Sequence, residues 1–261
     1  MHPMSMIELK IDGGVAEVVL NAPKKLNSLG EQDLLDLAAA LDEAAAAGAK
    51  ALYLRGEGRA FCAGRDIAGV VPAEDDVADF LGNKVTGVLK KISEFPAPTF
   101  AAVQGACLGV GLGLALACDV VYVAESAKIG SPFANLGATL DSGGHWLFTE
   151  RLGTHRTLDL IYTAEFMSGR EAVEQGLFSR WVADDELDEF TRSRVARVAE
   201  GAQLAFATSK KLVQDIRDRR IGMWESIADE NVAQGELCKS EDYAEGFKAF
   251  QEKRKPTFTG K

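Results

Sequence analysis

Residues 139–148, TLDSGGHWLF, hold an acid, a hydroxyl and an imidazole close together, as Asp141, Ser142 and His145. A serine beside a histidine and a carboxylate is the set of groups that nucleophilic catalysis uses. Asp141 alone could instead act as a general base that removes a proton and returns it elsewhere. It could also simply cap the start of a helix. The other residues of the chain have to decide between these roles.

The serine nucleophile finds no support elsewhere in the chain. No G-x-S-x-G sequence occurs, and the only histidines are His2, His145 and His155. Neither the nucleophile elbow of the α/β-hydrolases nor a protease-like histidine motif is present. We therefore expect Ser142 to be a small residue at a helix start that caps the helix or orients Asp141. We expect His145 to pack or to form a hydrogen bond locally.

Two glycine-rich segments could bring backbone N–H groups close to a ligand. Residues 60–67, AFCAGRDI, follow a buried strand, and their small side chains leave the main chain accessible. At residues 109–111, GVG, a strand meets a helix start, where N–H groups are free and the helix dipole is positive. Facing each other, the two would form an oxyanion hole for a thioester-derived enolate. The alternative for the first segment is a tight exit from the strand.

Composition excludes several classes of function. The net charge is −10 and no long basic run occurs, which argues against nucleic-acid binding. The four cysteines have no CxxC spacing and the histidines no HxxxH spacing, so we expect no metal site. The N-terminus lacks a secretory pattern, which indicates a reduced, cytoplasmic setting with the cysteines as small apolar fillers.

Residues 101–118 form an apolar run in which Gln104 is the only polar residue. The run is long enough to suggest a membrane span. Four glycines lie between Gly105 and Gly113, however, and such a density weakens a helix. We predict a buried strand that passes through a glycine turn into a buried helix, and no membrane partner.

The remaining pattern predicts an α/β body followed by helices. Residues 6–20 read as two strands about a Gly13-Gly14 turn. Residues 28–48 read as a helix, with Ser28 and Glu31 at capping-box spacing and Gly48 at its end. Further strands are expected at 51–56, 99–105 and 119–124, and further helices at 77–94, 110–117, 186–200, 203–220, 223–239 and 242–254. We assign residues 1–200 to the α/β core and 201–261 to a C-terminal helical region.

Four segments in this order resemble the enoyl-CoA hydratase/isomerase (crotonase) superfamily, and together they cover nearly the whole chain. They are RAFCAGRDI, VQGACLGVGLGLALACDVVYVAESAKIGSP, LDSGGHWLFTERLG and SEDYAEGFKAFQEKRKPTF. The resemblance implies a spiral of β-β-α repeats with C-terminal helices that drive assembly into a trimer, often a dimer of trimers. It also implies an acyl-CoA thioester substrate and no cofactor beyond the CoA moiety of that substrate.

The resemblance assigns roles to individual residues. The oxyanion-hole donors would be the backbone N–H groups of Arg65 and Val110. Valine keeps this donor where many relatives have glycine, but it narrows the pocket. Lys253 matches a lysine near the CoA phosphates, although a solvated helix face is the alternative. The expected substrate-binding residues are Leu26, Ala63, Gly64, Asp66, Ile67, Gly111, Phe133 and Lys253.

The same resemblance bears on the acid groups. Hydratases of this family use two glutamates, whose positions are Gly113 and Phe133 here, which argues against ordinary hydration. Asp141 stands where 1,2-epoxyphenylacetyl-CoA isomerases and dienoyl-CoA isomerases carry an aspartate. We expect one carboxylate to shuttle the proton, with Phe133, Trp146 and Phe148 raising its pKa. The alternatives are a hydratase, a thioester hydrolase or a non-catalytic acyl-CoA-binding homologue.

Overall fold

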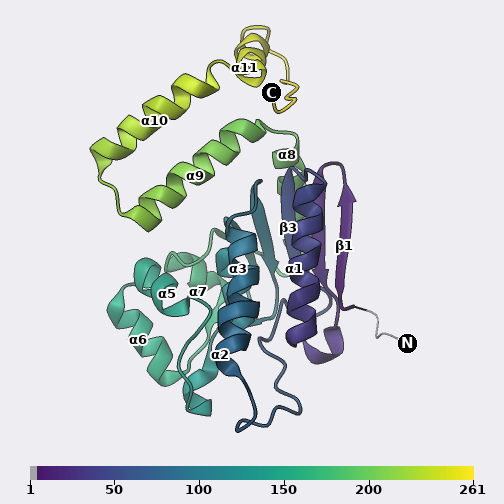
Figure 1. Cartoon of the computed structure of the whole chain (residues 1–261), viewed down its shortest axis with the longest axis vertical. Coiled ribbons are helices and arrows are strands. Elements are labelled where there is room, and N and C mark those ends of the chain that lie inside the picture. The colour runs from purple at the N-terminus through teal and green to yellow at the C-terminus, as the bar shows by residue number, and fades with distance from the viewer. Residues whose placement is uncertain (1–4) are drawn as a thin grey trace.

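A β-hairpin opens the fold in this computed structural model, which describes residues 5–261. Strands β1 (Ile7–Asp12) and β2 (Val15–Leu20) pair antiparallel, with Asp12 opposite Val15 (Figure 1). Gly13 and Gly14 have φ angles of 55° and 81°, the left-handed values that a two-residue turn of this kind requires. The hairpin expected within residues 6–20 is confirmed.

The hairpin forms one edge of a six-stranded sheet with the order β1-β2-β3-β4-β6-β9. Strands β2, β3 (Ala51–Gly56), β4 (Thr99–Val103), β6 (Val120–Ala124) and β9 (Arg180–Val182) run parallel to one another. Their carboxyl ends therefore meet at one edge, where open parallel sheets place their ligand-binding loops.

A smaller sheet runs beside the large one. Strands β5 (Ala106–Leu108) and β7 (Lys128–Gly130) pair parallel, and β8 (Met167–Ser168) pairs antiparallel with β7. The chain after β3 joins this sheet through a parallel bridge between Cys62 and Cys107. Each repeat thus gives a strand to the large sheet, a short strand to the small sheet and then a helix. The expected β-β-α spiral is confirmed, although the short strands were not predicted from the sequence.

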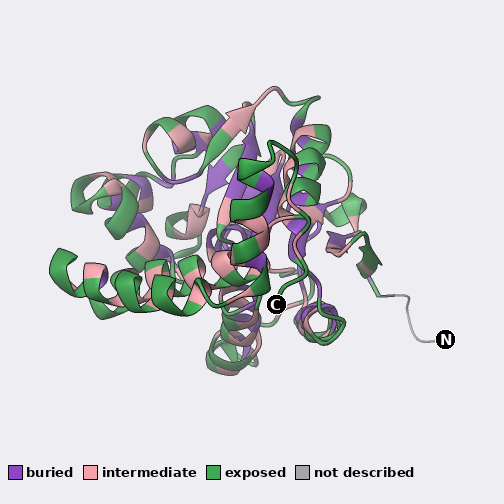
Figure 2. Cartoon of the chain, turned by 90° about the horizontal axis from the view of Figure 1, so that it is seen from above, coloured by how far each residue is buried: buried purple, intermediate pink, exposed green. Residues whose placement is uncertain are grey.

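Helices cover the sheets on the outside. Residues 77–94, expected as one helix, form a continuous helical segment, α2 (Val77–Asp79), η2 (Phe80–Val85) and α3 (Thr86–Ser93), with a π-type turn in the middle. Figure 2 shows the buried positions concentrated in the strands and the exposed positions along the outer helices. The other helices before residue 187 are η1 (Pro23–Lys25), α1 (Glu31–Ala46), α4 (Val110–Ala117), η3 (Pro132–Leu136), α5 (Gly144–Leu152), α6 (Thr154–Thr163) and α7 (Gly169–Glu174).

The start of α1 differs from the prediction. Gly30 precedes the helix, and the Asp33 carboxylate accepts a hydrogen bond from the Gly30 N–H at 2.9 Å. The capping box of Ser28 and Glu31 is therefore wrong. The reason is that Leu29 is still held as a strand, with both its N–H and its carbonyl bonded to the loop after β3. The helix cannot begin before that bridge ends.

The apolar run of residues 101–118 behaves as expected. It contains most of β4, then β5 and α4, and its strand and helix positions are largely buried in the core. Across residues 5–261, the search for a helix that is long and apolar enough to cross a membrane finds none. The strand, glycine turn and helix predicted for this run are confirmed.

The four C-terminal helices are confirmed, and the last two stand apart from the body. Helix α8 (Leu187–Ala199) packs on the large sheet. Helix α9 (Gln203–Arg219) is tied to the body, because Lys210 donates to the Phe95 carbonyl at 2.9 Å and Gln214 to the Ser93 carbonyl at 2.8 Å. Helices α10 (Met223–Leu237) and α11 (Glu241–Gln251) extend away from the body (Figure 1). Helix α9 has no buried residue at all. The expected division at residue 200 falls in the turn between α8 and α9, and it stays a prediction.

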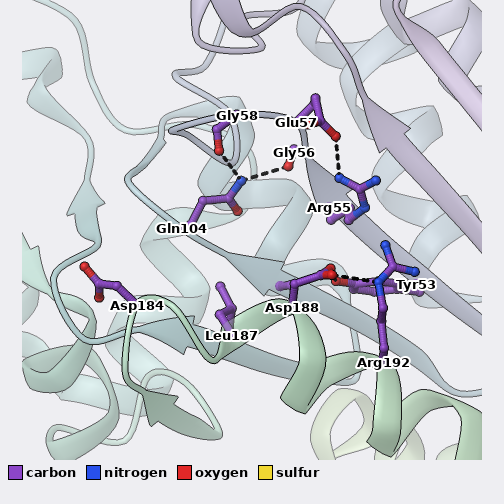
Figure 3. A pocket seen from close by; sticks show the side chains of 11 residues that line it. Tyr53, Arg55, Gly56, Glu57, Gly58, Gln104, Asp184, Leu187, Asp188 and Arg192 are labelled. Atoms are coloured by element: carbon purple, nitrogen blue, oxygen red, sulfur yellow. Dashed lines mark hydrogen bonds and ion pairs between the residues drawn. The ribbon is translucent and has the colours of Figure 1, made fainter.

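A polar network fastens α8 to the sheet. Asp188 accepts hydrogen bonds from the Tyr53 hydroxyl at 2.9 Å and from Arg192 at 2.8 Å. Arg192 also donates to Glu17, which binds Arg55 as well. Figure 3 shows Tyr53, Arg55, Asp188 and Arg192 around a cavity of about 420 Å³. The charged groups that line this cavity already pair with one another. We therefore interpret them as a cluster that stabilises the fold, and not as the lining of a ligand site.

We predict that Arg192→Ala lowers the free energy of unfolding by about 1–2 kcal/mol at pH 7. Hydrogen bonds from Arg192 lower the pKa of Glu17 from 4.5 to about 2. A depressed carboxyl pKa stabilises the fold above pH 4.5, and this contribution is lost as the pH falls toward 2. Denaturant unfolding should therefore show that the variant is less stable than the wild type at pH 7, and that the difference in free energy of unfolding becomes smaller as the pH falls from 4.5 toward 2. Arg197→Ala, on an exposed position of the same helix, is the control, and a pH-independent deficit would contradict the assignment.

Candidate active site

Two amide side chains, one fully buried and one half-buried, hold the loop that follows β3. Asn27 is fully buried, and its amide nitrogen donates to the carbonyls of Glu57, Ala60 and Phe61 at 3.0, 2.8 and 3.2 Å. Its amide oxygen accepts the N–H of Ala22 at 2.8 Å. These bonds satisfy carbonyls that would otherwise be left unpaired in the interior, so Asn27 fixes the course of the loop.

Gln104 performs the same task from the end of β4. Its amide nitrogen donates to the carbonyls of Gly56 at 2.8 Å and Gly58 at 3.1 Å, bonds that are visible in Figure 3. Sequence analysis did not assign a role to either amide. A signal was nevertheless present, because Gln104 is the only polar residue of an apolar run, and a polar side chain that is partly withdrawn from water needs hydrogen-bond partners.

The two expected oxyanion donors have free N–H groups. The loop pairs with the segment before α1, where Ala63 N donates to Leu26 O and Asp66 N donates to Leu29 O, both at 2.9 Å. Within residues 5–261, the N–H of Arg65, which lies between these bonds, has no hydrogen-bond partner. The same holds in that range for the N–H of Val110, the first residue of α4.

The turns that carry these donors lie against each other. A methyl group added at Gly109 would come within 4.0 Å of the Gly64 Cα, and one added at Gly64 within 3.0 Å of the Leu108 carbonyl oxygen. Gly109 has φ 52°, and Gly111 packs against Cys62 so closely that an added methyl group would lie 2.4 Å from its carbonyl oxygen. The geometry brings together the two sources of N–H groups, as an oxyanion hole requires.

The two positions of the hydratase glutamates are filled in different ways. The Phe133 ring lies beside the oxyanion turn, since a methyl group on Gly109 would be 3.0 Å from its Cζ atom. At Gly113 an added Cβ would lie 2.5 Å from the Ser142 Cβ and 3.1 Å from the Ser142 carbonyl oxygen. An aromatic ring therefore occupies one position, and a neighbouring backbone closes the other.

Asp141 is partly buried and does not cap α5. Gly143 precedes that helix, and neither Asp141 nor Ser142 makes a side-chain capping bond to it. Instead the Ser142 hydroxyl donates to Asp141 Oδ1 at 2.7 Å. Burial raises the pKa of Asp141, while the Ser142 hydrogen bond and the charges of Arg65 and His145 act in the opposite direction. The capping role considered for Asp141 and Ser142 is wrong, and the hydrogen bond from Ser142 agrees with the orienting role that was the alternative.

The Arg65 side chain has a structural role, which differs from the role expected of its backbone N–H. Its guanidinium binds both oxygens of Asp75, at 2.7 and 2.6 Å, and stacks 3.9 Å from the centre of the Phe80 ring. The pair ties the segment after the loop back onto the body. Asp141 lies near α4 through its neighbour Ser142, since a Cβ atom at Gly113 would lie 2.5 Å from the Ser142 Cβ.

The expected CoA-contacting residues divide into two groups. Leu26, Asp66 and the largely exposed Ile67 lie on the paired segments next to Ala63 and Gly64. Lys253 instead follows α11, at the opposite end of the molecule from the dark blue loop before α2 (Figure 1). Within one chain the structure does not bring Lys253 to the other site residues.

The aromatic residues after Asp141 do not all face it. Phe148 is buried in the core, and Trp146 packs under the guanidinium groups of Arg217 and Arg220, 5.8 and 5.7 Å from its ring centre. A cavity of about 310 Å³ lies between α3, α4, α5 and the end of α9, and Trp146 and Ser142 are among the residues that line it. Trp146 therefore borders open space on the Ser142 side.

The other predictions for reactive side chains can be placed as well. His145 Nε2 lies 3.3 Å from Thr139 Oγ1, the local contact that was expected. Cys62, Cys107 and Cys118 are buried, and burial raises the pKa of each thiol, whereas Cys238 is exposed and is not a core filler. Among residues 5–261 no group of three or more His, Cys, Asp or Glu side chains is arranged to hold a metal ion.

The fold and this site define a class of protein, and comparison with known proteins identifies it. Residues 10–261 match the family model for enoyl-CoA hydratase/isomerase, so the chain belongs to that family, within the crotonase superfamily. A probable enoyl-CoA hydratase of Rhodobacter capsulatus is 36% identical over 255 residues, which cover 98% of each chain. The 1,2-epoxyphenylacetyl-CoA isomerase of Escherichia coli is 30% identical over 263 residues, covering 99% of this chain and 100% of the relative.

Solved structures agree with this assignment. An enoyl-CoA hydratase from Bacillus anthracis superimposes with a TM-score of 0.90 at 28% identity, over 98% of this chain and 100% of the other. A related hydratase subunit from Geobacillus kaustophilus gives a TM-score of 0.88 at 34% identity, over 98% of both chains. The crotonase fold expected from the sequence is confirmed.

We predict that Asn27→Asp lowers the free energy of unfolding by about 2–4 kcal/mol, because a carboxylate oxygen would face three carbonyls that now accept N–H groups. Acyl-CoA binding should weaken along with stability. Denaturant unfolding and ligand titration measure the two effects. Asn231→Asp, on an exposed residue of α10, serves as the control, and equal behaviour of the two variants would contradict the role of Asn27.

Proposed function

We propose that this enzyme isomerises an unsaturated or epoxidised acyl-CoA through an enolate, with Asp141 as the single base. The observation that carries the proposal is the state of the Asp141 carboxyl. It is partly buried, its pKa is raised, and it is not used to cap the helix that follows it. A carboxylate withdrawn from water without a structural task is costly, which favours a functional one.

The proposed reaction moves one proton. Asp141 removes a proton from the carbon next to the thioester carbonyl of a 3-enoyl thioester, or from the γ carbon of a 2-enoyl one. The electron pair passes to the carbonyl oxygen, which gives a dienolate. The N–H groups of Arg65 and Val110 stabilise the negative charge that develops there. The protonated Asp141 then returns the proton to another carbon of the dienolate as the double bond shifts. The substrate supplies the CoA moiety, and the step needs no further cofactor.

The absence of a carboxylate at Gly113 and at Phe133 supports a reaction that needs only one base. Hydration needs a water molecule to be activated while a carbon is protonated, work commonly divided between two acid–base groups. Neither a glycine covered by Ser142 nor a phenylalanine ring can take part in that transfer. The cavity that Ser142 and Trp146 border offers space for a bulky acyl end.

Hydration is the second candidate, and one observation favours it. Most of the similar proteins, including those of Rhodobacter capsulatus and Bacillus subtilis, are named probable enoyl-CoA hydratases. In that case Asp141 would activate water rather than shuttle a proton along the acyl chain. The products formed from a panel of thioesters separate the two reactions.

We predict that Asp141→Asn lowers kcat for double-bond migration by about 10²–10⁴-fold while acyl-CoA affinity changes little. The assay follows crotonyl-CoA, 3-enoyl-CoA and phenylacetyl-derived thioesters, with products identified by mass and NMR. Because burial raises the pKa of Asp141, wild-type kcat should fall as the pH drops through a value above 3.8. The same burial destabilises the charged form, so Asp141→Asn should be at least as stable as the wild type at pH 7.

Asp185→Asn, at an exposed carboxylate outside the site, is the matched control and should leave kcat unchanged. Full isomerase activity in Asp141→Asn would refute the proposed base. Loss of crotonyl-CoA absorbance without migration would favour hydration, free thiol release would favour a thioesterase, and tight binding without any turnover would favour a non-catalytic homologue.

We further propose that the chain assembles as a homotrimer or a dimer of trimers through α9–α11. These helices expose large apolar side chains and enclose a cavity of about 520 Å³ with the C-terminal segment. Because Lys253 lies away from the site within one chain, it would contact CoA phosphates only across a subunit boundary. The exposed apolar residues on these helices are Leu204, Val213, Ile216, Met223, Trp224, Val232, Phe247 and Phe250.

We predict a mass in solution of three or six times the 28.0 kDa of one chain, measured by light scattering at micromolar concentration. Phe250→Glu should shift the distribution toward smaller species, because Phe250 is 85% exposed in the single chain and a buried charge is costly. Tyr162→Glu, at a residue 74% exposed on α6, is the control. A monomeric wild type would contradict the proposal.

A further inference from the structure

Ser142 occupies an unusual backbone conformation beside the proposed base. Its φ angle is 54°, in the left-handed region that residues other than glycine seldom adopt. Such strain persists only where the surroundings impose it, and it is concentrated at functional sites. Here the hydroxyl of Ser142 donates to Asp141 Oδ1 at 2.7 Å. Within residues 5–261, Asp141 Oδ2 accepts no hydrogen bond. One oxygen of the carboxylate is therefore hydrogen-bonded and the other is free to act on a ligand.

Helix α4 leaves room for this conformation because residue 113 is glycine. A Cβ atom at position 113 would lie 2.5 Å from the Ser142 Cβ, 3.1 Å from its carbonyl oxygen and 3.4 Å from its hydroxyl oxygen. Only the missing side chain of Gly113 lets Ser142 approach α4 so closely. Val110, the proposed oxyanion donor, lies one turn earlier on the same helix. Helix α4 thus both contacts Ser142 and presents the N–H group of Val110.

We infer that Ser142 is a positioning residue, which holds Oδ1 of Asp141 so that Oδ2 transfers the proton, and that Gly113 is the contact that keeps it in place. This inference rests on the proposed function of Asp141. It assigns Ser142 no covalent role, since the hydroxyl is committed as a donor to the carboxylate. It also explains the glycine at 113 by a packing requirement, independently of any loss of an acid there.

Other charges act on the same carboxyl and must be held constant in the test. They are the guanidinium of Arg65, from the loop after β3, with its partner Asp75, and the imidazole of His145, from α5. None of these is altered in the variants below. A change in the pH profile can therefore be traced to the Ser142 hydrogen bond.

The experiment compares Ser142→Ala with Ser142→Gly. Both remove the hydroxyl, but glycine adopts the left-handed conformation without strain. We expect kcat for isomerisation to fall by about tenfold in both variants, with acyl-CoA affinity within about threefold of wild type. The acidic limb of the kcat–pH profile should move to higher pH by about one unit, because the charged carboxylate loses a hydrogen bond. A wild-type profile in both variants, or a loss confined to Ser142→Ala, would overturn the inference.

A second pair of variants tests the packing contact. Gly113→Ala should lower kcat by about tenfold or more and shift the profile in the same direction, since Ser142 must move. Gly87→Ala is the matched control in α3, where an added methyl group meets nothing within 4 Å. Equal kcat in the two alanine variants would contradict the role of Gly113.

The outcomes also separate this inference from the proposed function. If Asp141→Asn retains activity, Asp141 is not the base and both proposals fail. If Asp141→Asn is inactive while both Ser142 variants keep the wild-type rate and pH profile, the base stands and only the role of Ser142 fails.

Discussion

The site depends on how the carbonyl groups of the loop after β3 are satisfied. The side-chain amides of Asn27 and Gln104 donate six hydrogen bonds to these carbonyls, and the amide oxygen of Asn27 accepts the N–H of Ala22 in turn. The same loop then pairs with the segment before α1 through Ala63 and Asp66, and the N–H of Arg65 between them is left free. The N–H group proposed as an oxyanion donor thus belongs to a loop that side-chain amides hold in place.

Close backbone contacts connect the loop after β3 to the turn before α4. The chain at Cys62 pairs with β5, β5 leads into α4, and α4 presents Val110. Glycines at 64, 109 and 111 permit distances that a methyl group would prevent. Because interiors packed in this way deform little, the two donors keep their relative positions without a ligand. Preorganised donors of this kind avoid reorganisation during the reaction.

Much of the large sheet and all of the C-terminal helices follow from the sequence, since hydrophobic periodicity and glycine turns are local signals. The helix start at Gly30 does not, because a long-range bridge at Leu29 overrides the local capping pattern. The residues proposed as oxyanion donors were predicted from short motifs. Asn27 and the bond from Ser142 to Asp141 were not, since their partners are defined only by the folded loops. Lys253 matched a motif, yet one chain does not bring it to the site.

The contact between Gly113 and Ser142 also limits how such an enzyme can change over evolution. A side chain at position 113 and the present path of residues 141–143 exclude one another, because the clash involves backbone atoms as well as the serine side chain. Substitutions at the two places are therefore strongly non-additive. A glutamate gained on α4 would be harmful until the neighbouring loop had moved, and the loop has no reason to move first. A reaction that needs an acidic side chain both at position 113 and in the neighbouring loop could therefore evolve from this protein only through inactive intermediates.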